Sequence, residues 1–153
     1  MAEVYNVKYI IDKEVGKDYK HKSAYSNLAF KAIPSILTGA CGNGVNTEIH
    51  YEGIKNIMIY IGMLNDKQLK YTEEKIILNY KGSIKSDVDG MWHPSVKMGD
   101  IVKKGDKVGE IKDYFGKKIK DIISLNDGVV CLLKKNPHIK LDDSLIEINE
   151  IKI

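Results

Sequence analysis

The pattern of apolar and polar positions divides the chain into two kinds of segment. Up to about residue 64, short apolar runs alternate with stretches in which apolar residues recur every three or four positions, as in strands that alternate with helices. From about residue 75 the apolar runs are short and Gly-Asp pairs interrupt them, which is typical of β structure. The sequence therefore predicts an α+β protein. We expect a partial α/β segment (residues 1–64), a polar linker (65–74) and an all-β domain of the barrel-sandwich kind (75–153).

The first segment is expected to hold four elements in the order strand, helix, strand, helix. Residues 4–11 mix β-branched and aromatic side chains and predict a strand. Ser23 is a suitable N-cap for a helix that Pro34 would stop. The brief apolar run at residues 33–37 predicts a buried strand, and a second helix is expected to begin near Thr47. One face of that helix is expected to be apolar, and its members are Ile49, Ile54, Ile57, Met58, Ile61 and Leu64.

This first segment is too small to cover its own sheet. Strands that alternate with helices imply parallel pairing, and a parallel sheet is normally covered on both faces. Two strands and two helices leave an open sheet edge and one bare face. We therefore expect either a second chain, or another copy of this one, to complete the sheet, or an unusually reduced domain.

The β segment repeats on itself. Residues 97–102 and 103–108 each place a Gly-Asp pair after lysine, a combination that predicts a tight turn feeding a short strand. A longer echo aligns residues 102–111 with residues 139–148, so that lysine, aspartate, glutamate and a final isoleucine coincide. Two copies of one strand-turn-strand unit predict a pseudo-symmetric β sandwich in which each half buries the apolar face of the other.

Composition and charge exclude several classes of protein. The chain has 153 residues, of which 43% are apolar, and its 24 basic and 21 acidic residues are interspersed. A nucleic-acid partner is not expected, because phosphate binding needs a concentrated basic face. The sequence shows no signal-peptide pattern and no stretch of about 18 apolar residues. We expect a cytoplasmic protein without membrane contact, in which Cys41 and Cys131 are reduced.

The residues that could carry chemistry form no recognisable site in the sequence. A metal site built from Cys41, His50 and His93 is conceivable, but the histidines have no metal-ligand spacing, and partly exposed or hydrogen-bonded histidines are the favoured interpretation. The glycine loop at residues 38–44 (TGACGNG) lacks the lysine of a phosphate-binding loop. Nothing orients His50 as a base for a Cys41 nucleophile. No metal or cofactor site is expected in this chain alone.

Lys117 raises the hypothesis of a carrier or binding module. Biotinyl and lipoyl domains present a modified lysine on a hairpin halfway between two half-repeats, and Lys117 falls near that position. Its neighbours are Gly116 and Lys118, whereas lipoyl domains have a DKA motif there and biotinyl domains an MKM motif. A plain basic turn is therefore the favoured interpretation.

Three stretches together resemble a known family. They are IPSILTGACGNG (residues 33–44), HYEGIKNIMIYIGML (50–64) and GMWHPSVKMGDIVKKGDKVGEI (90–111). In this order they are similar to the C-terminal half of the succinylglutamate desuccinylase/aspartoacylase family, and the resemblance extends from about Tyr5 to Ile148. It implies an α/β catalytic domain followed by a barrel-sandwich β domain, and zinc-dependent hydrolysis of the amide bond of N-acylated amino acids.

The same resemblance implies that the catalytic groups are missing. The zinc ligands of the family, a His-x-x-Glu pair and a later histidine, belong to an N-terminal region that this chain does not contain. Gly39 occupies the position of the general-base glutamate, and glycine cannot take a proton from zinc-bound water. Pro34, Gly42 and Gly44 match the family as residues that determine backbone shape.

Three hypotheses about function follow. The leading one is a truncated, catalytically silent relative of the deacylases. The second is a subunit of a split deacylase, in which another chain supplies the rest of the sheet and the zinc ligands. The third is a carrier or binding module that uses the β domain alone. Zinc is expected only where a partner chain completes the site.

Overall fold

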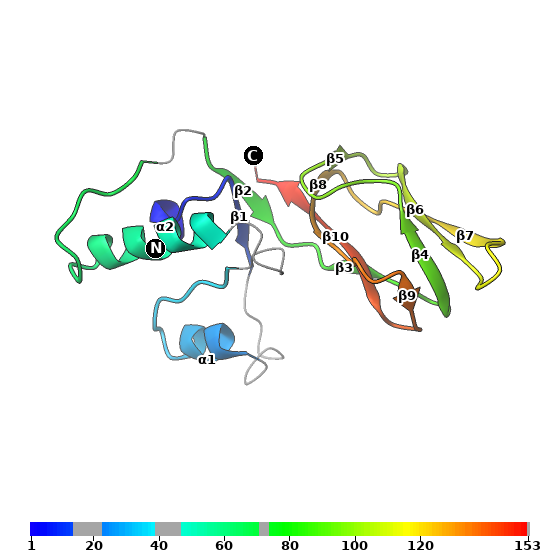
Figure 1. Ribbon diagram of the computed structural model, residues 1–153, viewed down its shortest axis with the longest axis horizontal. Helices are drawn as coiled ribbons and strands as arrows, with labels where there is room; N and C mark the ends of the chain where they lie inside the picture. Colours follow the sequence, from blue (N-terminus) through cyan, green and yellow to red (C-terminus); the bar gives the residue numbers. More distant parts are fainter. Residues whose placement is uncertain (14–22, 39–46, 71–73, 153) are drawn as a thin grey trace. The chain divides into compact units, whose positions relative to one another are not determined.

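A computed structural model describes residues 1–13, 23–38, 47–70 and 74–152 (Figure 1). The chain divides into two compact units, Met1–Ile76 and Ile77–Ile153. The described helices lie in the first unit, and most of the strands lie in the second. This arrangement confirms the predicted α+β class.

The first unit contains a short 3-10 helix, one strand and two α-helices. Their bounds are η1 Ala2–Val4, β1 Tyr9–Asp12, α1 Ala24–Phe30 and α2 Thr47–Tyr60. The predicted cap of α1 is confirmed: the Ser23 hydroxyl oxygen accepts from the N–H of Ser26 at 3.3 Å, and the Ser26 hydroxyl oxygen accepts from the N–H of Ser23 at 3.2 Å. These two bonds satisfy amides that the first helical turn leaves free. The strand expected at residues 4–11 begins only at Tyr9 and ends at Asp12. Before it, the N–H of Tyr5 donates to the carbonyl of Ala2 and the N–H of Val7 to the carbonyl of Tyr5, so these amides are used in local turns.

The strand predicted at residues 33–37 is wrong. Helix α1 ends in a turn in which Ala32 has a positive φ of 55°, and the N–H of Ile33 donates to the carbonyl of Leu28 at 2.9 Å. This bond is the closing bond of a helix C-terminal cap, so the N–H that begins the predicted strand is already used. The parallel strand pair expected between residues 33–37 and 4–11 is therefore not formed either.

The second unit consists of short antiparallel strands. Their bounds are β2 Ile76–Asn79, β3 Ser83–Lys85, β4 Gly90–Pro94, β5 Ile101–Val102, β6 Lys107–Lys112, β7 Lys118–Ile123, β8 Gly128–Leu133, β9 His138–Ile139 and β10 Ser144–Ile151.

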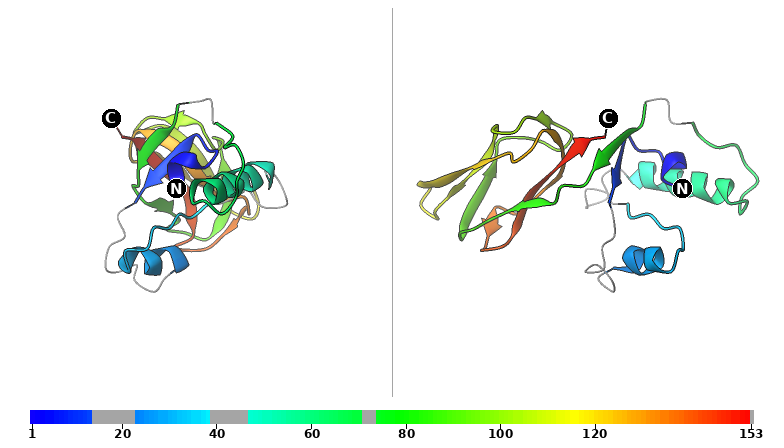
Figure 2. Two further views of the ribbon diagram at one scale, coloured as in Figure 1. Left: turned by 90° about the vertical axis from the view of Figure 1, so that its left-hand side faces the viewer. Right: turned by 180° about the vertical axis from the view of Figure 1, so that it is seen from behind.

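These strands form two open sheets, which lie as two layers in Figure 2. In one, the order is β2-β10-β8-β5, with β3 also paired to β10, and in the other it is β7-β6-β4-β9. Neither sheet closes on itself, so the second unit consists of two open sheets that share one core. The core draws side chains from both: Trp92, Val102, Val108, Ile111, Ile122, Val130, Ile139, Leu145, Ile146 and Ile148.

The predicted repeat is present and its halves are interleaved. One half runs β4, β5, β6 and the other runs β8, β9, β10. Asp106 and Asp143 take equivalent roles, since each accepts a hydrogen bond from the backbone N–H three residues before it, at 2.8 and 2.9 Å. The residues just before them, Gly105 and Asp142, both have positive φ. The short strand of each half pairs with the other half, β5 with β8 and β9 with β4.

Candidate functional site

The glycine loop that the sequence singles out lies outside the described residues. Gly39, Cys41, Gly42 and Gly44 all fall in residues 39–46. The structure does describe both ends of this loop, at Thr38 and at the start of α2. The surroundings of Thr38 and of the start of α2 are therefore what the structure shows next to Gly39, the residue that the resemblance aligns with a general base.

A small group of polar side chains lies at the ends of this loop. The hydroxyl oxygen of Tyr5 is 2.5 Å from Nδ1 of His50 and 3.3 Å from Oγ1 of Thr38, and Thr38 Oγ1 is 3.4 Å from the same nitrogen. Tyr5 is buried, with 2% of its surface exposed. Because a neutral imidazole has one donor and one acceptor nitrogen, the contact at Nδ1 fixes the ring and leaves Nε2 as its second polar atom. We call Tyr5, Thr38 and His50 the Tyr5 cluster.

Helix α2 and a lysine position this cluster. Gly53 lies directly under the Tyr5 ring, where a β-carbon would be 2.5 Å from Cζ. The ammonium of Lys75 donates to the carbonyl of Tyr5, and its second acceptor, the carbonyl of Val7, is 3.4 Å away. Burial lowers the pKa of Lys75. Helix α2 thus supports the Tyr5 ring, and the ammonium of Lys75 holds the backbone carbonyl of Tyr5.

Asn56 connects α2 to the segment that precedes it in the chain and to the segment that follows it. Its Nδ2 donates to the carbonyls of Val4 at 3.2 Å and Leu69 at 2.8 Å, and its Oδ1 accepts from the N–H of Leu69 at 2.9 Å. Asn56 is 1% exposed. Buried amides are normally satisfied in this way, and here the bonds fix which face of α2 points inward.

The structure does not test the metal site that the sequence left conceivable. Nδ1 of His50 is engaged by Tyr5, Cys41 lies outside the described residues, and His93 is exposed on β4. Among the described residues there is no group of three or more His, Cys, Asp or Glu side chains that could hold a metal ion. Nor does any helix in that part of the chain combine the length and apolar character needed to cross a bilayer.

Lys117 lies on the turn between β6 and β7. Asp113 holds this turn, because its Oδ1 accepts from the N–H groups of Phe115 and Lys117, both at 2.9 Å. The Lys117 side chain is exposed, and Phe115 is 97% exposed. The turn therefore presents both side chains to solvent. Modification of Lys117 stays a hypothesis.

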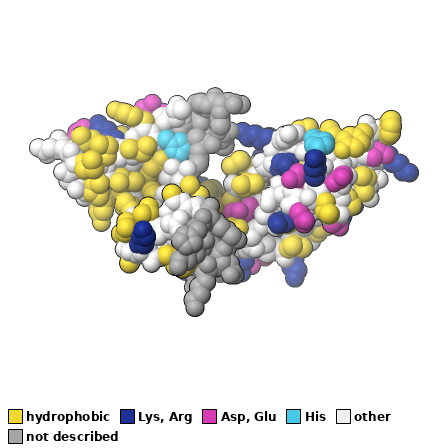
Figure 3. Space-filling view, turned by 90° about the horizontal axis from the view of Figure 1, so that it is seen from below, with side chains coloured by type: hydrophobic (Ala, Val, Ile, Leu, Met, Phe, Trp, Pro, Cys, Tyr) yellow, Lys and Arg dark blue, Asp and Glu magenta, His cyan; other side chains and the backbone are white. Residues whose placement is uncertain are grey.

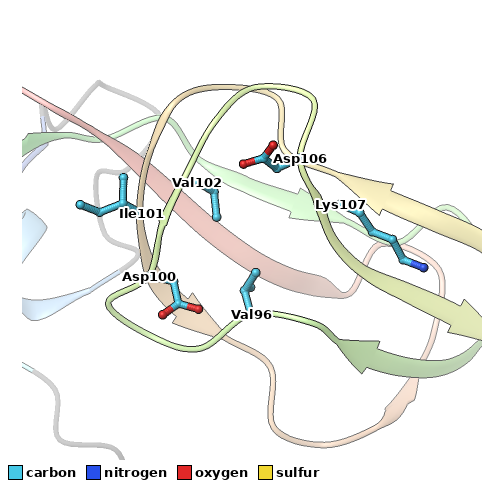
Figure 4. A pocket seen from close by; sticks show the side chains of 6 residues that line it. All are labelled: Val96, Asp100, Ile101, Val102, Asp106 and Lys107. Atoms are coloured by element: carbon cyan, nitrogen blue, oxygen red, sulfur yellow. The ribbon is translucent and has the colours of Figure 1, made fainter.

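A shallow hollow of about 480 Å³ opens beside the two Gly-Asp turns (Figure 4). Val96 and Val102 face each other across it. Its acidic groups are already occupied, since Oδ2 of Asp100 and Oδ2 of Asp106 each accept a hydrogen bond from a backbone N–H of their own turn at 2.8 Å. We interpret the hollow as a by-product of the paired turns. Its lining is Val96, Asp100, Ile101, Val102, Asp106 and Lys107.

Charged side chains on β6 and β7 form a chain of ion pairs. Lys107 contacts Glu110 and Asp121, both at 2.7 Å, and Lys112 contacts Glu110 at 3.0 Å. Hydrogen bonds from Lys107 and then Lys112 lower the pKa of Glu110 to about 2, and hydrogen bonds from Lys107 and Lys118 lower the pKa of Asp121. These groups are solvent-exposed and mutually neutralised, so they stabilise the hairpin without forming a site.

The apolar face predicted for α2 lies in part on the surface of the first unit. The buried residues of this helix are Gly53 and Asn56. Ile54 is 54% exposed and Ile61 is 53% exposed. In Figure 3, apolar side chains gather over the first unit. The sequence signal for the inward face was the Gly53-x-x-Asn56 spacing, which places a small and a polar residue one helical turn apart.

No family model and no curated protein matches the sequence. Solved structures do match it. The ectoine utilization protein EutE (DoeB) from Ruegeria pomeroyi superposes with a TM-score of 0.79 at 17% identity, over 97% of this chain and 48% of that protein. A succinylglutamate desuccinylase/aspartoacylase from Rhodobacter sphaeroides superposes with a TM-score of 0.81 at 15% identity, over 99% of this chain and 48% of that protein.

A succinylglutamate desuccinylase from Silicibacter sp. TM1040 gives a TM-score of 0.77 at 16% identity, over 97% of this chain and 47% of that protein. This chain has the fold of about half of such a protein. The resemblance to the C-terminal half of the succinylglutamate desuccinylase/aspartoacylase family is confirmed at the level of fold. The chain spans about half the length of the structures it matches.

Proposed function

We propose that this chain is a partial relative of the zinc-dependent desuccinylase/aspartoacylase deacylases and that it does not hydrolyse amides by itself. The observation that carries the proposal is the match to these structures, which extends over 97–99% of this chain and about 48% of theirs. The likeness therefore includes residues of both units. A fold of this kind needs its other half before it can form a complete catalytic domain.

The position of Gly39 supports the catalytic part of the proposal. The family resemblance aligns Gly39 with the general-base glutamate, and a glycine has no group that accepts a proton from water. Zinc supplies a polarised water in deacylases of this type. In this proposal the chain contributes shape around the site, and the zinc ligands come from outside residues 1–153.

A second candidate function is favoured by the exposed apolar residues of the first unit. In this alternative the chain is a subunit of a split deacylase, and the partner supplies the zinc ligands and the rest of the sheet. The Tyr5 cluster would then line the rim of the shared site, where Nε2 of His50 offers a hydrogen bond. Gly39 argues against this alternative, because the base would also have to come from the partner.

Two finer assignments complete the proposal. We assign the second unit to the barrel-sandwich type on the support of its interleaved repeats, in a form with two open sheets. We place the protein in the cytoplasm, with which the unpaired thiol of Cys131 agrees.

Native mass spectrometry of the untagged protein purified from its own cells tests the proposal, combined with assays on N-acyl amino acids. We expect no hydrolysis by the isolated chain at its unmodified mass. Zinc-dependent hydrolysis by the chain alone would refute the proposal. Zinc and hydrolysis that appear only with a second chain would establish the split deacylase, and a mass increase on Lys117 would establish the carrier hypothesis.

A further inference from the structure

Helix α2 has an apolar stripe that faces away from its own unit. Tyr51, Ile54, Met58 and Ile61 follow each other at intervals of three, four and three residues, the spacing that aligns side chains along one helix face. Tyr51 is 63% exposed, Ile54 54% and Ile61 53%, and Met58 is partly exposed. Ile61 follows the last residue of α2, and its N–H still donates to the carbonyl of Ile57 at 3.0 Å. The stripe is therefore continuous to the helix end.

The helix cannot hide this stripe by rotating. Its opposite face is already docked through Gly53, which admits the Tyr5 ring, and through Asn56, which bonds to Val4 and Leu69. Any rotation that brought Ile54 inward would break the bonds of a buried amide and drive a side chain into Tyr5. The outward direction of the stripe is thus set by specific contacts within the first unit.

The first unit also lacks a hydrophobic core of ordinary size. Among its described residues, the fully buried ones are Tyr5, Ser26, Gly53 and Asn56. The second unit, which is of similar length, buries the shared cluster of valine, leucine, isoleucine and tryptophan side chains described above. A helix that docks through glycine and asparagine while exposing isoleucines is typical of an element that lies between two layers.

The rim of the stripe has the polar character of an interface edge. Lys55 borders it and forms an ion pair with Asp66 at 2.7 Å. This pair is solvent-exposed and leaves the apolar centre uninterrupted. An apolar centre with a charged rim is the usual composition of a protein–protein contact.

We propose that the stripe Tyr51, Ile54, Met58, Ile61 is the contact surface for a polypeptide that supplies the other half of the desuccinylase/aspartoacylase fold. The structures that superpose on this chain are about twice as long as the matched part, so half of their fold has no counterpart in residues 1–153. The inference rests on the proposed function through this half-length match. It adds the location of the contact and the helix that forms it.

The test uses full-length protein from its own cells and compares matched isoleucine-to-glutamate variants. The partner is identified by mass spectrometry, purified separately and titrated against the wild type, Ile54→Glu, Ile61→Glu and the control Ile101→Glu. Ile101 is a 71% exposed isoleucine of the second unit, so the control makes the same chemical change outside the stripe. Tyr51→Ser is a milder stripe variant, and circular dichroism checks that each variant is folded.

We expect the identified partner to have the fold of the missing half. We expect Ile54→Glu and Ile61→Glu to weaken its binding at least about tenfold, because a buried glutamate at an apolar contact has no counter-charge, with Ile101→Glu unchanged. Equal binding by the stripe variants and the control would overturn the proposal. So would a wild-type protein found only as a monomer or homo-oligomer, or a partner of unrelated fold. Hydrolysis by the chain alone would refute the proposed function and leave this binding result intact.

Discussion

The ring of Tyr5 lies against Gly53 so closely that a β-carbon on residue 53 would come within 2.5 Å of it. Alanine normally favours a helix over glycine by about 1 kcal/mol. We predict the opposite sign for Gly53→Ala here, a loss of about 1–3 kcal/mol, because the Tyr5 ring would have to leave its place beside His50. Faster hydrogen exchange of α2 amides, with the second unit unaffected, is the expected result.

Tyr5→Leu provides the control for this prediction. Removing the ring should relieve the clash, so Gly53→Ala should cost less in the Tyr5→Leu background than in the wild type. A double-mutant cycle measures this coupling directly. Equal costs in both backgrounds would contradict the close packing described here.

The second unit should fold without the first. It holds the shared apolar cluster and both β-sheet repeats, whereas the first unit buries mainly small and polar residues. We predict a well-dispersed amide spectrum for residues 75–153 and a poorly dispersed one for residues 1–74. A disordered spectrum from the C-terminal fragment would show that the core depends on the first unit.

The stability of the second unit should decline in acid in a way that Glu110 partly controls. The pKa of Glu110 is lowered from 4.5 to about 2 by hydrogen bonds from Lys107 and Lys112. A carboxylate with a lowered folded-state pKa stabilises the fold above its unfolded pKa, and this stabilisation is lost as the pH falls from 4.5 toward 2. We predict that Glu110→Gln makes urea denaturation less pH-dependent in this window.

The matched control for this experiment is Glu150→Gln, which removes one exposed negative charge that pairs with Lys81 instead. Added salt should reduce the difference between wild type and Glu110→Gln, since exposed ion pairs are screened. If wild type and Glu110→Gln lose stability in parallel from pH 4.5 to 2, the ion-pair chain on β6 and β7 contributes nothing measurable.

Restoring a glutamate at residue 39 should not create a deacylase. Gly39→Glu supplies the group that the family resemblance finds missing, but in zinc-dependent hydrolysis the base acts on a metal-bound water, which requires zinc ligands as well. We predict no hydrolysis of N-acyl amino acids by the purified variant with added zinc. Metal-dependent activity of Gly39→Glu would reveal zinc ligands within this chain.

The turns of the second unit could be predicted from sequence because each depends on local chemistry. A Gly-Asp pair after lysine needs only a residue that tolerates positive φ and a carboxylate that accepts from its own turn, and Asp106 and Asp143 do this in the same way. The Ser23 cap is equally local. The sequence therefore indicated both the repeat and the start of α1 without knowledge of the tertiary contacts.

The errors lie where tertiary contacts decide the outcome. Residues 33–37 are apolar like a buried strand, yet Leu37 is 73% exposed and Ile33 is engaged in the cap of α1. The inward face of α2 was not predicted, because Tyr5 and Asn56, which set it, are distant in sequence. The Tyr5 cluster was missed for the same reason: its members are 12 to 45 residues apart.

The two repeats of the second unit exchange their short strands. Strand β5 leaves its own half to pair with β8, and β9 leaves its half to pair with β4. Domain-swapped dimers exchange elements between two protomers in the same way, whereas here the exchange takes place within one polypeptide. A half on its own would lack the short strand that the other half supplies, and it would leave its side of the shared core uncovered. The second unit is therefore expected to fold and unfold cooperatively.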